Sequence, residues 1–280
     1  MRPHQRRLND GVLQLALRRV GCRTVIHQCY YHVPLQVLRP VYLDDTGTAY
    51  VYVLNPCGGI LGGDTYTMTV WLEAGAQALF TTPSATKLYA AAHAAAQQTI
   101  DFTVDAGAVL TYMPEQVIPF TDAALQQQMT VRLGSGACVF LGEIVAPGRI
   151  ARGEVFAYRE YDACLRVHDA ADRLVLLERT RLQPRQRRFD GKGLFEGYTY
   201  LGTWYAMCEG KRLASTLPEA LHALLTGRDK LIGSATELEH GGVAVRILAE
   251  DHSSIQQAMF DVWDTLRQHV LGYPAVRCRT

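Results

Sequence analysis

Carboxylates in apolar or strand-like segments are the residues of this sequence with the widest choice of chemistry. A buried, isolated charge is costly, so each such carboxylate needs a cation partner or a functional reason. Pairing with Arg149, Arg152 or Lys87 would satisfy them structurally. Alternatively, their hard oxygen atoms would hold a divalent cation weakly enough to release it along a polar path. The five glutamates concerned are Glu115, Glu143, Glu154, Glu160 and Glu178.

A glycine-rich loop at residues 55–64 is the most unusual stretch of the chain. It reads Asn-Pro-Cys-Gly-Gly-Ile-Leu-Gly-Gly-Asp, with glycine pairs at Gly58-Gly59 and Gly62-Gly63. Glycine permits positive φ angles and the close approach of a partner or a second backbone, so the loop is suited to contact. Four separate turn requirements are the structural alternative. Phosphate binding is disfavoured, because the spacing fits neither glycine-rich phosphate motif and a strand-like segment follows.

No catalytic set can be assembled around this loop. Asp64 closes it, and residues 81–87 follow with Thr-Thr-Pro-Ser-Ala-Thr-Lys, which includes Thr86 and Lys87. Ser84 and Lys87 have the Ser-x-x-Lys spacing of penicillin-binding enzymes, but neither companion motif of those enzymes occurs. The nine histidines are scattered singly, as structural histidines usually are. The sequence therefore predicts no catalytic residue.

The seven cysteines are also scattered. They are odd in number and form no Cys-x-x-Cys pair and no cluster with zinc spacing. Most are therefore expected to be reduced, buried and packed as small hydrophobic residues. Cys57 differs because it lies in the glycine-rich loop, where its thiol would be within reach of a soft metal or a partner.

Composition limits the class of protein. The chain has 280 residues, 48% of them hydrophobic, and a formal net charge of +1, which is typical of a globular protein rather than a disordered one. The N-terminus lacks the apolar segment of a signal peptide and no apolar run could span a bilayer, so we expect a cytoplasmic protein without a membrane partner. A basic run from Arg179 to Arg188 fits a solvated loop or a contact for an acidic protein, and nucleic acid is not expected as a partner.

A recurring pattern indicates the fold class. Residues 70–76, 102–108 and 131–137 each approach a glycine through alternating apolar residues and continue into a second apolar run. Strand pairs that recur about every thirty residues are typical of stacked β layers, although chance similarity among hairpins would also produce three copies. The sequence predicts a mainly β protein with β-helix-like stacked sheets and a few helices, including a C-terminal helix.

Helix signals are concentrated towards the end of the chain. Residues 218–226 begin with Pro-Glu and precede a glycine, and residues 251–270 place apolar side chains at three- and four-residue intervals. A short helix is also expected in the alanine-rich residues 90–98. No linker divides the chain, so we expect a single domain over residues 1–280, with a β body at about 20–210 and a helix-containing part at about 211–280.

Four motifs, in order along the chain, resemble those of the urease accessory proteins of the UreD family, also called UreH. Later segments at 175–179 and 241–246 are similar as well, so the resemblance spans most of the sequence. Cys57 departs from the family pattern, in which the glycine-rich loop usually has a second proline at this position. The four motifs are residues 55–64, 81–89, 114–120 (Pro-Glu-Gln-Val-Ile-Pro-Phe) and 142–154.

The resemblance implies a non-catalytic scaffold. Family members bind the helical protein UreF, then the GTPase UreG, and dock on apo-urease so that nickel reaches its active site. Nickel would be in transit, with no tightly bound cofactor, and a homodimer would form within the complex. Asp64, Glu143 and Glu178 fall in separate family-like motifs and would act as transient nickel ligands if the repeats stack.

The resemblance also suggests partner-binding or structural roles for other motif residues. Trp263, in the expected C-terminal helix, would support contact with the helical partner, with burial in the core as the alternative. A β-helical enzyme acting on a polymer or a small ester is the alternative function, and it would turn over substrate without partners. The remaining motif residues are Asn55, Gly58, Gly59, Gly62, Gly63, Thr86, Lys87, Arg149 and Arg152.

Overall fold

The computed structural model describes residues 10–189 and 191–277, and within them the strands form two sheets. The first sheet contains β1 (Asp10–Val20), β2 (Arg23–His32), β5 (Thr65–Leu72), β8 (Ala96–Val104), β11 (Ala124–Leu133), β13 (Glu160–His168) and β14 (Leu174–Leu182). The second contains β3 (Gln36–Val37), β4 (Ala49–Leu54), β6 (Gln77–Thr81), β7 (Thr86–Leu88), β9 (Val109–Tyr112), β10 (Val117–Pro119), β12 (Cys138–Val145), β15 (Tyr200–Cys208), β16 (Leu231–Glu237) and β17 (Val243–Ala249). The helices are α1 (Leu217–Leu225), α2 (His252–Leu271) and a 3-10 turn at Ile150–Arg152.

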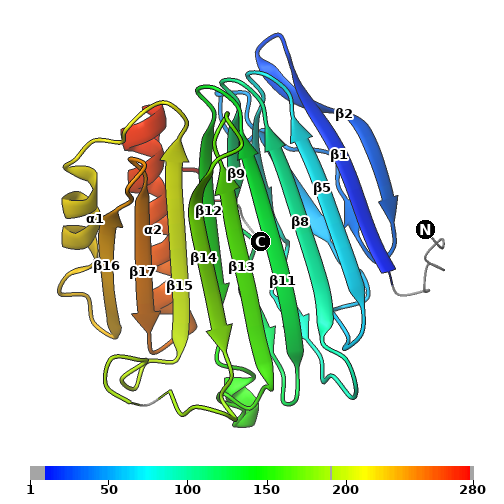
Figure 1. The fold of residues 1–280 in the computed structure, drawn as a ribbon, viewed down its shortest axis with the longest axis vertical. Helices are drawn as coiled ribbons and strands as arrows, with labels where there is room; N and C mark the ends of the chain where they lie inside the picture. Colours follow the sequence, from blue (N-terminus) through cyan, green and yellow to red (C-terminus); the bar gives the residue numbers. More distant parts are fainter. Residues whose placement is uncertain (1–9, 190, 278–280) are drawn as a thin grey trace.

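The two sheets lie face to face, and the chain winds between them (Figure 1). The first sheet has the order β14-β13-β11-β8-β5-β1-β2, and the main path of the second is β16-β17-β15-β12-β9-β6-β4-β3. The central strands are parallel to their neighbours, so each pass through both sheets adds one coil. The additional strands at the ends of each sheet, among them β2, β14 and β15, are antiparallel. The mainly β, solenoid-like class predicted from the sequence is confirmed.

The recurrence near thirty residues marks the turns between coils. Gly75, Gly107 and Gly136 have φ angles of 69°, 65° and 69°, in the left-handed region that glycine adopts without a steric penalty. The turns also stack on one another, because the Gly75 N–H donates to the Ala106 carbonyl and the Gly107 N–H donates to the Ser135 carbonyl, both at 3.0 Å. The repeats are therefore successive coils of one solenoid.

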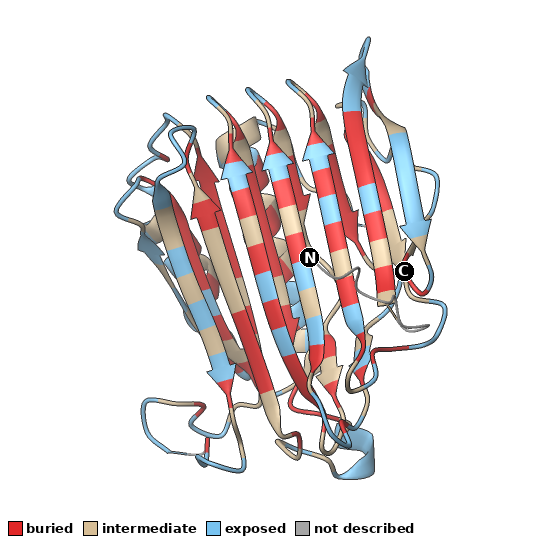
Figure 2. Ribbon diagram, turned by 45° about the vertical axis from the view of Figure 1, so that its right-hand side comes forward, coloured by how far each residue is buried: buried red, intermediate tan, exposed pale blue. Residues whose placement is uncertain are grey.

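The main core is formed by side chains that alternate along each strand between buried and exposed positions. On the first sheet, buried residues such as Met68, Ile100 and Met129 stand side by side in register and face the second sheet, while their neighbours in the sequence face outward (Figure 2). A second core lies between the opposite face of the second sheet and the two helices. There the indole N–H of Trp204 donates to the Met259 carbonyl at 3.1 Å.

Both C-terminal helices confirm the sequence prediction. Helix α2 begins after Asp251, whose side chain accepts a hydrogen bond from the Ser254 N–H, and it ends at Gly272 in the left-handed conformation. The helix expected at residues 90–98 is wrong, because Ala96 already begins β8 and pairs with the strands on both sides. No helix within the described residues is long and apolar enough to cross a bilayer.

The cysteines correct another expectation. Cys138 and Cys208 face each other across the β12–β15 pair and form a disulfide. Cys22, Cys29 and Cys57 are exposed free thiols, and Cys164 is half-buried. Most of the six cysteines in the described residues are therefore not the buried, reduced residues that their scattered spacing suggested, and Cys278 lies outside the described residues.

Candidate functional site

A cavity of about 200 Å³ lies beneath the glycine-rich loop and the segment Thr81–Lys87. Residues from both sheets wall it, so it continues into the space between them. Three of its polar lining residues, Tyr112, Gln127 and Glu143, also line a smaller cavity of about 40 Å³. The two cavities therefore meet at Glu143.

The glycine-rich loop forms one rim of the larger cavity. Its glycines allow the loop backbone to pack closely against the segments that contain Lys87 and Ala91. A Cβ atom at Gly59 would come within 2.5 Å of the Lys87 carbonyl oxygen, and one at Gly62 within 2.4 Å of the Ala91 Cα atom. Gly58 and Gly63 instead have positive φ angles of 80° and 86°. Each of the four glycines thus answers a separate local requirement.

Asn55 holds the loop in this shape. Its Nδ2 atom donates to the Gly59 carbonyl at 2.9 Å and to the Tyr66 hydroxyl at 3.2 Å, while its Oδ1 atom accepts from the Cys57 N–H at 3.0 Å. The thiol of Cys57 is left exposed to solvent. Asn55 is therefore an architectural residue of the cavity rim.

The other rim carries Thr86 and Lys87 from β7. Both line the larger cavity, and Lys87 is exposed. The main chain of Lys87 is fixed by the loop, since its carbonyl accepts a hydrogen bond from the Ile60 N–H at 2.8 Å. The rim thus places an ammonium group and several hydroxyls at the entrance.

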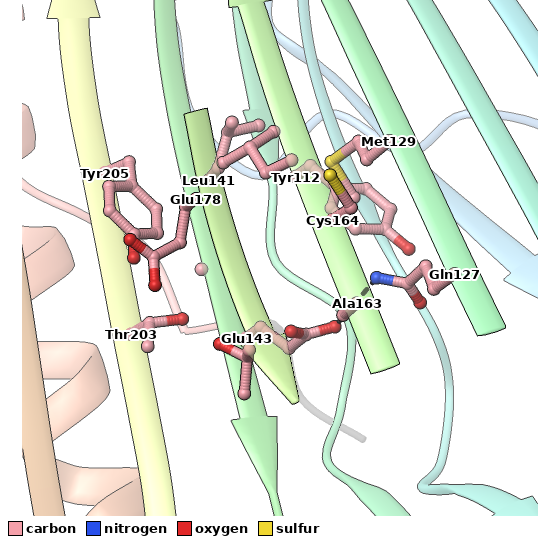
Figure 3. A pocket seen from close by; sticks show the side chains of 13 residues that line it. Tyr112, Gln127, Met129, Leu141, Glu143, Ala163, Cys164, Glu178, Thr203 and Tyr205 are labelled. Carbon is pink, nitrogen blue, oxygen red and sulfur yellow. Dashed lines mark hydrogen bonds between the residues drawn. The ribbon is translucent and has the colours of Figure 1, made fainter. Parts of the chain in front are cut away.

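Glu143 is a half-buried acid at the junction of the two cavities. It projects from β12 between the sheets, where the Gln127 Nε2 atom on β11 donates to its Oε1 atom at 3.1 Å (Figure 3). Burial raises the pKa of Glu143, and the neighbouring Gln127 amide and Tyr161 hydroxyl only partly oppose this. Burial also raises the pKa of Tyr161, with Glu143 adding to the effect, so its phenol remains protonated.

Glu178 lies beyond Glu143, in the smaller cavity. Figure 3 shows both carboxylates in the same close-up, with Thr203 and Tyr205 beside Glu178. The Arg246 Nη2 atom on β17 donates to the Glu178 Oε2 atom at 2.7 Å, which joins the edge of the first sheet to the second. Burial, and then the charge of Glu178, raise the pKa of Tyr205 to about 12.

Asp64 is not in this pair of cavities. It is buried at the end of the glycine-rich loop and lines a separate pocket of about 270 Å³ together with Cys57 and Tyr89. Its Oδ2 atom accepts from the Leu61 N–H at 2.8 Å and from the Tyr66 hydroxyl at 3.3 Å. Gly59 and Tyr66 line both this pocket and the larger cavity, so the two spaces adjoin at these residues.

The other candidate residues lie outside these cavities. Arg149 pairs with Glu154 and lies 4.0 Å above the centre of the Phe120 ring, and this ion pair holds the pKa of Glu154 below its usual range. Arg152 is exposed in the 3-10 turn. Trp263 is only 1% exposed and packs in the core beneath α2, so its side chain offers no surface to a partner.

The polar side chains of the two cavities offer oxygen donors of the kind that divalent cations accept. Two carboxylates, an amide and several phenols supply oxygen donors in a largely apolar interior. Within residues 10–189 and 191–277, no three side chains of His, Cys, Asp or Glu converge in a way that could hold a metal ion. A divalent cation would therefore meet few ligands at any one point.

Sequence reasoning missed Gln127, although a signal was present. Gln127 is flanked by Leu125 and Met129 at two-residue spacing, so a polar side chain stands on the apolar face of a strand. The phenols of Tyr112, Tyr161 and Tyr205 carried no such signal, because tyrosine is common on both faces of strands.

Comparisons with known proteins agree on one family. The family model described as "UreD urease accessory protein" matches residues 9–280. The chain is 33% identical over 272 residues to the urease accessory protein UreD of Cenarchaeum symbiosum (strain A), which covers 95% of each chain. It is 31% identical over 272 residues to the protein of the same name from Actinomyces naeslundii, which covers 96% of this chain and 98% of that protein.

Proposed function

Since the chain belongs to the UreD urease accessory protein family, we propose that it is a non-enzymatic scaffold that carries nickel to apo-urease in the cytoplasm. UreF and UreG would be its partners in a complex that contains a homodimer, with nickel as cargo in transit. The observation that best supports this proposal is the meeting of two interior cavities at Glu143, with Glu178 in the farther one.

The route would use carboxylates in succession. Asp64 would act near the glycine-rich loop, with Glu143 at the junction of the cavities and Glu178 in the smaller one. Because the three carboxylates do not share one site, each would hold the ion briefly and let it move on. Gln127 would orient the Glu143 carboxylate, and Arg246 would do the same for Glu178.

Reconstitution with purified components tests the proposed function. Apo-urease mixed with nickel, UreF and UreG should become active when this chain is added and remain inactive without it. The isolated chain should bind nickel more weakly than about 1 µM by calorimetry, because no site offers a full ligand set. Activation of urease to the same extent without this chain would refute the proposed role.

A further inference from the structure

The β1–β2 hairpin presents a cluster of exposed side chains at one edge of the first sheet. Val20 and Arg23 face each other across the turn, and Arg18 lies two residues before Val20, so these three share one face. On the neighbouring strand Trp71 is paired with Ala16, which has the same orientation as Arg18. We call Arg18, Val20, Arg23 and Trp71 the hairpin patch.

The hairpin patch holds two of the large hydrophobic side chains that the first sheet exposes, as it also does at Tyr30, Tyr31, Leu174 and Leu177. Trp71 is 47% exposed and Val20 is 52% exposed, and their strands are adjacent. The Cα atoms of Trp71 and Arg18 are expected to be roughly 8 Å apart, from the spacings along and between strands. An indole and a guanidinium are thus close enough to contact one partner together.

The two arginines of the hairpin patch form no ion pair with the described residues. In the described part of the chain, neither Arg18 nor Arg23 lies within ion-pair distance of a carboxylate, whereas Arg179 and Arg246 on other strands are each paired with one. The Arg23 guanidinium lies 4.9 Å from the centre of the Tyr42 ring, which fixes it while leaving its N–H groups free to donate outward.

From this arrangement we propose that the hairpin patch docks a protein surface that presents carboxylates around an apolar depression. Guanidinium groups bind carboxylates through paired hydrogen bonds, and Trp and Arg are the residue types that dominate binding energy at protein interfaces. Val20 and the Trp71 ring would fill the depression, and Arg18 and Arg23 would meet its acidic rim.

Nucleic acid fits the hairpin patch less well. The indole N–H of Trp71 donates to the Asp105 Oδ2 atom at 2.8 Å, so a carboxylate borders the ring that would have to stack on a base. Glu73 follows β5 two residues after Trp71 and adds a second negative charge nearby. Two arginines would neutralise few phosphate groups, so the electrostatic gain that drives nucleic-acid binding would be small here.

The hairpin patch lies on the outer face of the first sheet, whereas the carboxylate cavities lie between the sheets. It lies at the β1–β2 edge of the first sheet, and Glu178 lies on β14 at the opposite edge (Figure 1). Docking at the patch would therefore be separable from passage of a cation through the interior. The two proposals can fail independently of each other.

Photo-cross-linking tests the docking proposal. The photoreactive residue p-benzoylphenylalanine replaces the exposed Val20, and the full chain is assembled with UreF, UreG and apo-urease and irradiated. We expect a cross-link to one component, at a peptide that contains acidic residues beside apolar ones. A double variant Arg18→Glu/Arg23→Glu should lose this cross-link and bind the cross-linked component at least about tenfold more weakly.

A matched control makes the same change in net charge at a different position on the first sheet. Arg132 and Arg166 lie on the same outer face of the first sheet, on β11 and β13, so Arg132→Glu/Arg166→Glu changes the net charge equally. This control should retain the cross-link and the affinity, and all variants should keep the parent's circular dichroism. Equal weakening by both double variants, binding of the hairpin variant within twofold of the parent, no cross-link, or a cross-link displaced by added DNA would each overturn the proposal.

The same samples separate the two proposals. Urease activation without a cross-link at Val20 would refute docking at the hairpin patch and leave the proposed function intact. A cross-link to an acidic peptide in a complex that fails to activate urease would refute the proposed function and support the docking surface.

Discussion

The amide of Gln127 and the carboxyl group of Glu143 form a hydrogen-bonded pair that connects the two sheets through the core. Gln127 comes from β11 of the first sheet and Glu143 from β12 of the second, and 3.1 Å separates the donor nitrogen from the acceptor oxygen. Both residues line both interior cavities. The hydrogen bond therefore fixes the Gln127 amide and the Glu143 carboxyl group relative to each other where the two cavities meet.

Removal of the amide should leave the Glu143 carboxyl group without the Gln127 donor. We expect Gln127→Leu to lower the free energy of unfolding by roughly 1–3 kcal/mol, and Gln127→Leu/Glu143→Leu to recover part of that loss. Urea unfolding of both single variants and the double variant gives the coupling energy. Additive effects within about 0.5 kcal/mol would show that the two side chains do not support each other.

Glu143 should also make stability depend on pH. Burial raises its pKa above the value of about 4.3 in an unfolded chain, so the folded protein retains a proton that the unfolded chain has lost. The free energy of unfolding should therefore fall as pH rises from about 4.3 through the folded pKa.

Comparison with Glu143→Gln isolates this contribution, because the other titrating groups are common to both proteins. The stability of the variant relative to the parent should increase with pH across that window, as measured by urea unfolding. A difference that is independent of pH would mean that the pKa of Glu143 is not raised by folding.

Gly59 should not tolerate a side chain. A methyl group there would overlap the Lys87 carbonyl oxygen and the Tyr89 ring, each at 2.5 Å, so Gly59→Ala should lower the free energy of unfolding by roughly 1–3 kcal/mol. Gly191 is a suitable control, since a Cβ atom there meets only the Leu194 Cδ1 atom at 3.8 Å. Equal stability of the two alanine variants would contradict the close packing of the loop.

The Cys138–Cys208 disulfide predicts a dependence on reducing agents. It joins residues 70 apart in the sequence, so reduction should lower the free energy of unfolding by about 2–4 kcal/mol. Unfolding with and without dithiothreitol checks this, with Cys138→Ala/Cys208→Ala as the variant that should not respond. Alkylation of both thiols in protein kept free of reductant would show that the bond is absent.

Local patterns in the sequence predicted the repeating coils and both C-terminal helices. The glycine turns and the apolar stripe of α2 depend on spacings of a few residues, and such spacings can be read directly from the chain. The helix predicted for the alanine-rich residues 90–98 is wrong. Alanine favours a helix, but pairing with β5 and β11 places Ala96 in a strand. Non-local pairing decided the outcome.

Prediction of the site from the sequence would have required the register of strand pairs that are far apart in the chain. The contact of Glu178 with Arg246 joins residues 68 apart, and the disulfide requires Cys138 and Cys208 to be opposite each other. Neither can be found without knowing which strands pair. Asp64 shows the converse, since a motif resemblance grouped it with Glu143 and Glu178, whereas in the fold it lines a different pocket, which adjoins the larger cavity at Gly59 and Tyr66.

The carboxylate route is tested most directly by the nickel content of urease after assembly with amide variants. Asp64→Asn, Glu143→Gln and Glu178→Gln keep size and hydrogen-bonding capacity but remove charge, and Glu239→Gln is a control at an exposed turn. We predict that all four variants assemble with UreF, UreG and apo-urease as the parent does, and that the first three deliver less nickel and less urease activity. Nickel content and activity equal to the parent in all three would contradict the route through these residues.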